Sequence, residues 1–388
     1  MSRWAIWRSI IGLTAVCACV VWFPAHSMIA QRTTEDRLDE PGFWPRKSSR
    51  SATEYAGPSA CSPCHASIVA SQNSSAMATT LMHAKNSAIL QSHHALSFSV
   101  SRYRYEIRTD ASGNTYSVTD GASNLEATLS WAFGSGSVGQ SYLFEKPDGD
   151  FYEARVSYFG SLGALEFTPG RALSSPDSLE QAADRWVRPE ETFKCFSCHP
   201  TGSTIGGKFE QTHLILGVTC EACHGPGKRH VEAMKMAITK GKDVGQNTAI
   251  FGAVNLSPSD TLDFCGACHG SYWDVALMAT TEGVQTSRFQ PYRLEESKCW
   301  GNEGDKRLTC IGCHDPHKEL ETDLEAYDVA CLSCHQGSKD RRMVVKEARR
   351  SCPVSSKSCV SCHMPNVNVP AMHRSFRDHR IQIVRSTG

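Results

Sequence analysis

The sequence predicts a mainly helical and loop-rich fold with a small antiparallel β module inserted near its N-terminal end. One pentapeptide, C-x-x-C-H, occurs seven times in 388 residues, and six copies follow one another from Cys195 onward. Those six begin only 21 to 45 residues apart, which leaves room for short helices and loops but little for a protein-only core. Between the first and second copies no motif occurs, and apolar and polar residues alternate there with the period of a β-strand.

The pentapeptide is the attachment signature of haem c. Two thiols on one helical turn can form thioethers with the two vinyl groups on one porphyrin edge, and the adjacent histidine then binds iron. The sequence therefore predicts a multihaem c-type cytochrome with seven covalently bound haem c groups. The attachment residues are Cys61, Cys64, Cys195, Cys198, Cys220, Cys223, Cys265, Cys268, Cys310, Cys313, Cys331, Cys334, Cys359 and Cys362. The proximal ligands are His65, His199, His224, His269, His314, His335 and His363.

Zinc sites and disulfides are the competing interpretations of so many cysteines. Paired C-x-x-C groups also build zinc ribbons. A zinc site does not require a histidine directly after the second cysteine, yet all seven copies here have one, which favours haem over zinc. Adjacent cysteine pairs are also a poor framework for joining distant segments by disulfides. Of the 18 cysteines, 14 belong to motifs and two lie in the N-terminal apolar run, so Cys299 and Cys352 remain, either as a disulfide or as two thiols.

The N-terminus predicts export from the cytoplasm. Arg3 and Arg8 accompany a short apolar run that ends before Ala25-His26-Ser27, which is typical of a signal peptide cleaved after Ser27. An uncleaved membrane anchor is the alternative, although the run is short for a bilayer. We expect a signal at 1–27, a flexible polar leader at 28–55, a first haem segment at 56–95, the β module at 96–172 and a multihaem domain at 173–388.

The charge balance excludes a nucleic-acid partner. The chain has 40 basic and 40 acidic residues, and loss of the two arginines of the signal leaves 38 basic against 40 acidic, or −2. Each haem adds two propionates and one positive charge when ferric. Seven haems would bring the holoprotein to about −9 when oxidised and about −16 when reduced. We therefore expect an acidic holoprotein despite a sequence pI of 7.2.

Eight further histidines of the mature chain are candidates for the second axial ligand of the irons. They are His83, His93, His94, His213, His230, His317, His373 and His379. We expect five or six of them to bind iron, with His83, His213, His230, His317, His373 and His379 as the chosen set. His317 follows Pro316, which turns the chain, and His230 follows a Gly/Pro turn that predicts a helix reaching about Lys240. Met77, Met82 and Met364 are alternative ligands.

The number of axial ligands separates two classes of function. If every iron has two protein ligands, the protein relays electrons between redox partners, which we expect to be quinol-linked membrane proteins or other cytochromes. If one iron is open, that haem can act on a small nitrogen or sulfur species. No C-x-x-C-K variant occurs, so the lysine-ligated haem of ammonia-forming nitrite reductases is not predicted. A structural subunit of a larger haem assembly is a third, less favoured class.

The motif-free segment contains the elements of a β module. Ser99 to Arg108 alternates polar and apolar residues, and turns are predicted at Asp110-Ala-Ser-Gly, Thr119-Asp-Gly and Lys146-Pro-Asp-Gly. We expect five or six antiparallel strands. The stretch after the first motif that carries His83, His93 and His94 is expected to be helical, and a short helix is expected from Asp177 to Trp186. Gly134-Ser-Gly136 resembles a phosphate-binding glycine loop, but no strand-to-helix context follows, and a tight hairpin is the better interpretation.

Several motifs resemble a known group of bacterial haem proteins. Tyr55-Ala-Gly-Pro-Ser-Ala-Cys-Ser-Pro-Cys-His and Gly217-Val-Thr-Cys-Glu-Ala-Cys-His-Gly-Pro-Gly-Lys-Arg-His are similar to cytochrome c-554-like multihaem proteins. The ending Cys359-Val-Ser-Cys-His-Met-Pro is similar to multihaem cytochromes fused to tetratricopeptide repeats. The resemblance implies a periplasmic, mostly helical haem protein related to carriers that serve hydroxylamine oxidation. It also implies that His230, His317 and His379 are distal ligands, without showing which iron each one serves.

Overall fold

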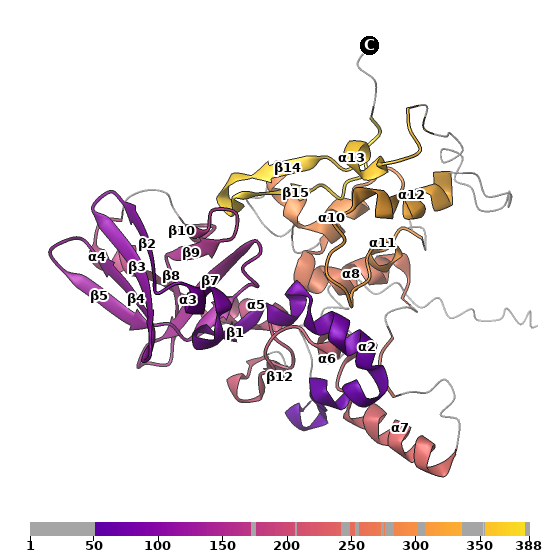
Figure 1. Ribbon diagram of the computed structural model, residues 1–388, viewed down its shortest axis with the longest axis horizontal. Helices are drawn as coiled ribbons and strands as arrows, with labels where there is room; N and C mark the ends of the chain where they lie inside the picture. The colour runs from indigo at the N-terminus through magenta and orange to yellow at the C-terminus, as the bar shows by residue number, and fades with distance from the viewer. Residues whose placement is uncertain are drawn as a thin grey trace, which may run out of the picture.

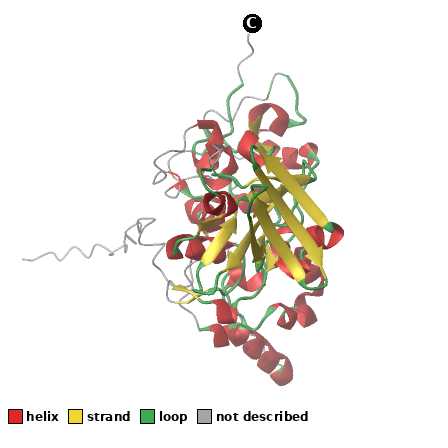
Figure 2. Cartoon of the chain, turned by 90° about the vertical axis from the view of Figure 1, so that its left-hand side faces the viewer, coloured by secondary structure: helices red, strands yellow, loops and turns green. Residues whose placement is uncertain are grey.

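The computed structural model describes residues 51–171, 176–205, 208–241, 249–252, 256–272, 275, 283–300, 307–335, 352 and 354–384. The expected signal at 1–27 and nearly all of the expected leader lie outside these residues. The chain contains helices and antiparallel sheets, as predicted. Most of the strands gather at one end of the molecule, and the short helices that carry the motifs occupy the rest, together with two small hairpins (Figures 1 and 2).

The β module begins with a four-stranded antiparallel meander. Its strands are β2 (Ala95–Val100), β3 (Tyr103–Asp110), β4 (Gly113–Thr119) and β5 (Asn124–Thr128). In β3 the side chains of Tyr103, Tyr105 and Ile107 are buried, while the intervening residues face outward. This period of two places one face of the strand on the core.

A second antiparallel sheet packs on the first. Its strands are β1 (Leu81–His83), β6 (Trp131–Phe133), β7 (Gly139–Glu145), β8 (Phe151–Ala154), β9 (Val156–Phe159), β10 (Ala164–Phe167) and β11 (Asp184–Trp186). Side chains of both sheets form one core, with Tyr105 and Tyr116 from the meander and Tyr142 and Phe144 from the second sheet.

The module therefore holds more strands than expected. Nine strands, β2 to β10, lie between Ala95 and Phe167, and the flanking strands β1 and β11 complete the second sheet. Several of these strands have only three or four residues, too short for alternation to show in sequence. The Gly134-Ser-Gly136 segment forms the turn between β6 and β7, as predicted. Gly134 has φ of 102°, and a Cβ atom there would lie 2.4 Å from the Gly139 carbonyl oxygen.

The motif region consists of short helices joined by loops. They are α2 (Ser62–Asn73), α5 (Pro189–Cys198), α6 (Cys220–His224), α7 (Lys228–Lys240), α8 (Pro258–His269), α10 (Gln290–Glu295), α11 (Cys310–Cys313), α12 (Asp328–His335) and α13 (Cys359–His363). A C-terminal hairpin of β14 (Asn366–Val369) and β15 (Arg374–Arg377) follows α13. The helix predicted after the Gly/Pro turn is confirmed as α7, which ends at Lys240.

Two other local predictions were wrong. The segment after the first motif was expected to be helical, but His83 lies in β1, which pairs with β6. The segment from Asp177 to Trp186 was expected to be one helix, but α4 (Leu179–Ala183) ends where β11 pairs with β8. In both places, pairing with a strand distant in sequence decides the local conformation. Small strands β12 (Thr204–Ile205) and β13 (Lys208–Phe209) follow the second motif.

Candidate haem-binding sites

Each C-x-x-C-H motif lies on, or begins, a short helix. The seven helices are, in motif order, α2, α5, α6, α8, α11, α12 and α13. Cysteines three positions apart on a helix lie on the same face. Each motif can therefore present two thiols to one porphyrin edge, with the following histidine beside them.

Three motif histidines face a second histidine from a distant part of the chain. The ring centroids of His65 and His230 are 6.4 Å apart, and the two planes differ by 22°. His224 and His317 are 6.1 Å apart with planes 3° from parallel, and His314 and His379 are also 6.1 Å apart. Two imidazoles bonded to one metal from opposite sides, at about 2 Å each, have their centroids about 6 Å apart. The spacing of all three pairs fits a haem iron between the rings.

Backbone carbonyls orient several of these imidazoles. The Nδ1 atom of His224 lies 2.9 Å from the Phe251 carbonyl oxygen, and Nδ1 of His379 lies 3.0 Å from that of Arg377. The motif histidines His199 and His363 make the same contact with Thr80 and Gln382. A hydrogen bond from Nδ1–H to a carbonyl leaves the Nε2 lone pair available for a metal.

A buried carboxylate joins the first and third motifs around His230. Glu221, inside the third motif, accepts hydrogen bonds from the backbone N–H groups of Ala56 and Gly57, 2.8 and 2.9 Å away. It also accepts one from Gly227 at 2.6 Å, directly before α7 begins. Because α7 starts there, His230 lies in its first turn and faces His65.

An ion pair fixes the segment that carries His379. Arg293 on α10 donates two hydrogen bonds to the carboxylate of Asp378, at 2.8 and 2.6 Å. The Ser297 hydroxyl donates to the His379 carbonyl oxygen at 3.1 Å and accepts from the Ile381 N–H at 2.8 Å. Burial lowers the pKa of His379 to about 4, so its imidazole is neutral at physiological pH. Neutral imidazole is the form that binds metals.

His317 is held by a short turn after the fifth motif. Its backbone N–H donates to the Asp315 carboxylate at 3.0 Å, and its Nδ1 atom lies 3.3 Å from the same group. Two residues further on, the Glu319 carboxylate accepts a hydrogen bond from the Ala76 N–H at 2.9 Å. This contact ties the turn to the segment after the first motif, and His317 lies over His224.

The other three predicted distal ligands lie in different surroundings. His83 stacks on Trp131 with centroids 4.4 Å apart. His373 has Nε2 3.3 Å from the Glu166 carboxylate, and its ring meets the edge of Phe159. His213 is exposed in a short 3-10 helix. Among the described residues, no motif histidine is seen to face any of these three, and their ligand roles stay predictions.

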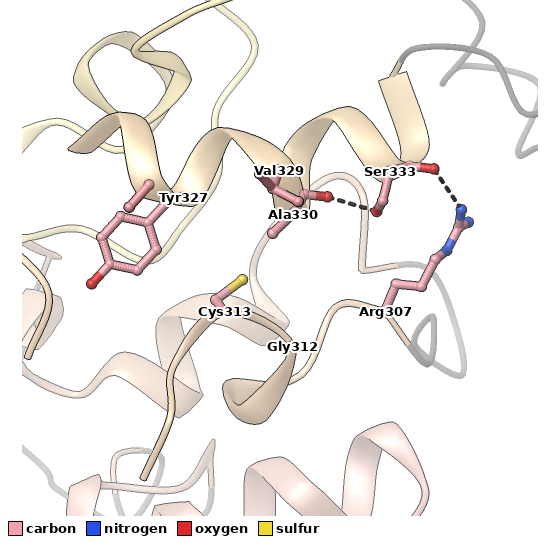
Figure 3. A pocket seen from close by; sticks show the side chains of 8 residues that line it. Arg307, Gly312, Cys313, Tyr327, Val329, Ala330 and Ser333 are labelled. Carbon is pink, nitrogen blue, oxygen red and sulfur yellow. Dashed lines mark hydrogen bonds between the residues drawn. The ribbon is translucent and has the colours of Figure 1, made fainter. Parts of the chain in front are cut away.

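A cavity of about 450 Å³ lies between the fifth and sixth motifs. Cys313 and Gly312 line one side, and Tyr327, Val329 and Ala330 line the other (Figure 3). The ring of Tyr327 meets the His314 imidazole edge-on at 5.4 Å. A mostly apolar recess beside a motif thiol suits the hydrocarbon edge of a porphyrin.

Sequence reasoning missed the residues that position the histidines. Arg293 and Tyr327 lie outside every motif, Glu221 occupies a variable position within the third motif, and each acts on another segment of the chain. Asp378 offered one clue, because it directly precedes a candidate ligand. Cys299 and Cys352 are both exposed, and the described residues contain no disulfide.

Comparison with known proteins agrees with this site. Residues 171–225, which include the second and third motifs, match the family described as Cytochrome c554 and c-prime. The multiheme cytochrome MtrA of Shewanella baltica (strain OS185) is 26% identical over 199 residues, which are 42% of this chain and 60% of MtrA. These findings support a multihaem c-type cytochrome.

The similarity to this relative is partial, since the chain spans about 60% of its length. Among solved structures, the outer cell wall cytochrome OcwA aligns with 85% of this chain and 80% of its own, at 15% identity and a TM-score of 0.38. No helix among the described residues is both long enough and apolar enough to span a bilayer.

Proposed function

We propose that this protein is a periplasmic or otherwise extracytoplasmic heptahaem c-type cytochrome that relays electrons between redox partners. The proposal draws on the seven attachment motifs, the three facing histidine pairs and the similarity to multihaem cytochromes. Bound haem iron supplies one-electron chemistry by alternating between its ferric and ferrous forms. The partners are other redox proteins, including quinol-linked membrane proteins or further cytochromes.

The facing histidines support a ligand assignment for three irons. His65 and His230 would hold the haem of the first motif, His224 and His317 that of the third, and His314 and His379 that of the fifth. In each pair the distal histidine follows the motif two places further along the chain. The ligands therefore join successive odd-numbered motifs to one another.

These pairs are the observation that carries the relay function. An iron with an imidazole on each side has no position for a substrate, so it can only accept and pass electrons. The carbonyl contact and the buried surroundings of His379 would hold this imidazole in one orientation toward a bound iron.

An oxidoreductase with one open haem is the alternative. Within the described residues, the facing histidine pairs involve three of the seven motif histidines. His199, His269, His335 and His363 belong to the other four sites. An enzyme acting on a small nitrogen or sulfur species would use one of these four.

Low-temperature EPR of the ferric holoprotein tests the assignment. We expect His230→Ala, His317→Ala and His379→Ala each to convert about one iron from low spin to high spin. His94→Ala, at an exposed position and outside the chosen set of ligands, serves as the control and should leave the spectrum unchanged. A strong high-spin signal in the unsubstituted protein would favour the enzyme. Unchanged spectra for all three variants would refute the ligand assignment.

Two simple measurements test the remaining parts of the proposal. A pyridine haemochrome assay should give seven haems per chain, and fractionation of cells should place the protein outside the cytoplasm. A stoichiometry well below seven would contradict the motif count, and haem-loaded protein in the cytoplasmic fraction would contradict the compartment.

A further inference from the structure

The fourth motif lies at the centre of the motif region. Its helix, α8, contacts α5 of the second motif, α11 of the fifth motif and α10. Leu262, Phe264 and Ala267 are buried along α8, whereas the motif helices α11 and α12 contain almost no buried side chains. Figure 1 shows α8 between the C-terminal helices α10 and α12 above it and the helices α2 and α6 below it.

One neighbour of α8 is the third motif. Cys223 and Cys265 both pack against the cluster formed by Phe264 and Ala267. The Phe251 ring lies 5.4 Å from Phe264, and the Phe251 carbonyl oxygen accepts the hydrogen bond from His224. The attachment side of the third motif therefore faces that of the fourth.

The fifth and second motifs also meet α8. Cys310 of the fifth motif packs against the cluster that contains Leu262 of α8, and its helix α11 contacts α8. The Cys198 thiol of the second motif donates to the Ala267 carbonyl oxygen at 3.6 Å. Three different motifs thus place a thiol against the fourth.

Other contacts connect the remaining motifs in single file. The Glu221 carboxylate of the third motif accepts hydrogen bonds from the N–H groups of Ala56 and Gly57, just before the first motif. Cys313 of the fifth motif and Ala330 of α12, the helix of the sixth motif, line one cavity, and Asp328 at the start of α12 accepts a hydrogen bond from the Cys359 N–H of the seventh motif. The second motif also touches the third, where the Thr219 N–H donates to the Thr201 hydroxyl. That contact involves the chain after His199, while the thiol that would carry the porphyrin faces α8.

We infer that the electron path is branched, with the fourth haem as a three-way junction. One arm runs from the fourth motif through the third to the first, and a second runs through the fifth and sixth to the seventh. The third arm is the second motif alone, which packs against the β module through Phe196 and Cys195. This inference rests on the proposed relay function and adds to it a terminal site that is reached only through the fourth haem.

The test removes the junction and counts the haems that each end can reach. In a background with Cys299→Ser and Cys352→Ser, a single cysteine carries a photoreducing ruthenium label. Lys357→Cys places it beside the seventh motif, and Ser67→Cys places it beside the first, both at exposed positions. The protein is diluted so that electrons do not pass between molecules, and repeated flashes are given in the presence of a sacrificial electron donor. These flashes reduce every haem that is connected to the label, and the change in haem absorbance gives the number of reduced haems.

Deletion of the fourth haem by Cys265→Ala and Cys268→Ala should divide the remaining six haems into groups of three, two and one. The label at 357 should reduce three haems and the label at 67 two, with one haem reached by neither. In the control, Cys61→Ala and Cys64→Ala remove a terminal haem, and the label at 357 should reduce all six that remain.

The outcomes separate the branch from the relay itself. If the label at 67 reduces three haems in the junction variant, the second haem belongs to the arm of the third, and the branch is wrong. If either label reduces all six, the fourth haem is not a junction. If the label at 357 reduces only one haem in the control variant, electrons do not pass between haems and the proposed relay function is wrong. If the junction variant does not fold, an experimental structure of the intact holoprotein with its haems decides between the two paths. The branch requires that the fourth haem be the one nearest to the second, and any other nearest neighbour would overturn it.

Discussion

The β module and the motif region obtain their stability from different sources. In the module, 19 buried apolar side chains from both sheets and from the adjoining helices and loops form one cluster, with Tyr105, Tyr116 and Tyr142 almost wholly excluded from water. In the motif region the clusters are small. One consists of Phe264 and Ala267, and another of Leu262, Leu294 and Trp300. Burial of apolar area stabilises a fold by roughly 25 cal/mol per Å², so the two regions differ widely in what protein packing alone contributes.

The difference leads us to infer that the motif region depends on bound haem for a core. Helices such as α6 and α11, with five and four residues, are far too short to be stable alone. Porphyrin faces and iron–histidine bonds would supply the missing apolar area and the cross-links between segments. Metal binding is coupled to folding in the same way in small metal-dependent domains.

The largest expected effect follows from withholding haem attachment. We expect the apoprotein to keep a folded β module while the motif region unfolds. In hydrogen–deuterium exchange, amides of β3 and β4 should remain protected by about a thousandfold or more, and those of α6, α11 and α13 should exchange at nearly unprotected rates. The holoprotein is the control, in which both regions should be protected. Protection of α11 in the apoprotein would show that the protein alone folds this region.

The same difference explains how far the sequence could predict the structure. The motif helices and α7 were predictable because cysteine spacing and a Gly/Pro turn act locally. The strand at His83 was not, because β1 exists only through pairing with β6. The three ligand pairs were not predictable as pairs, because each joins segments brought together by the fold, such as α2 and α7. The Arg293–Asp378 pair, which positions His379, left no pattern in the sequence.

The second-largest expected effect comes from disrupting the Arg293–Asp378 ion pair in the motif region. Arg293→Gln leaves the Asp378 carboxylate buried and unpaired, which costs about 3–5 kcal/mol. We expect a lower melting temperature and, because the His379 segment loosens, a partial high-spin signal from one haem. Arg104→Gln in the β module is the matched control, since its pair with Glu106 is exposed and worth less than about 1 kcal/mol. Equal destabilisation by the two variants would contradict the difference in burial.

A third effect is the dependence of stability on pH, which has opposite signs in the two regions. Burial, with Asp263 nearby, raises the pKa of Glu295 to about 7, whereas hydrogen bonds from Arg108 lower the pKa of Glu106. The folded motif region therefore holds a proton that the unfolded chain releases, and its stability should fall as pH rises from about 4.5 to 7, by up to about 3 kcal/mol.

Thermal melts of the holoprotein across this pH range measure the slope. Glu295→Gln should remove the decline, because the neutral amide does not ionise. Glu106→Gln should leave it unchanged, because the Glu106 carboxylate contributes its stability above its unfolded pKa and loses it only as pH falls below about 4.5. An identical slope in the Glu295 variant would mean that another group is responsible.

The smallest expected effect comes from substitutions at the contact between the motif region and the β module. The C-terminal hairpin reaches the β module through His373, which faces Glu166 at 3.3 Å, and through Arg374, which donates to the Ser137 carbonyl oxygen at 3.0 Å. A partly exposed pair of this kind contributes about 0–1 kcal/mol. His373→Gln should therefore change stability little and, because Nε2 faces the Glu166 carboxylate, should leave the EPR spectrum unchanged. Arg374→Gln, which alters the same contact without removing an imidazole, is the control. If only the His373 variant gains a high-spin signal, His373 binds iron as the sequence predicts, and the hairpin then belongs to the haem core and is not merely a contact with the β module.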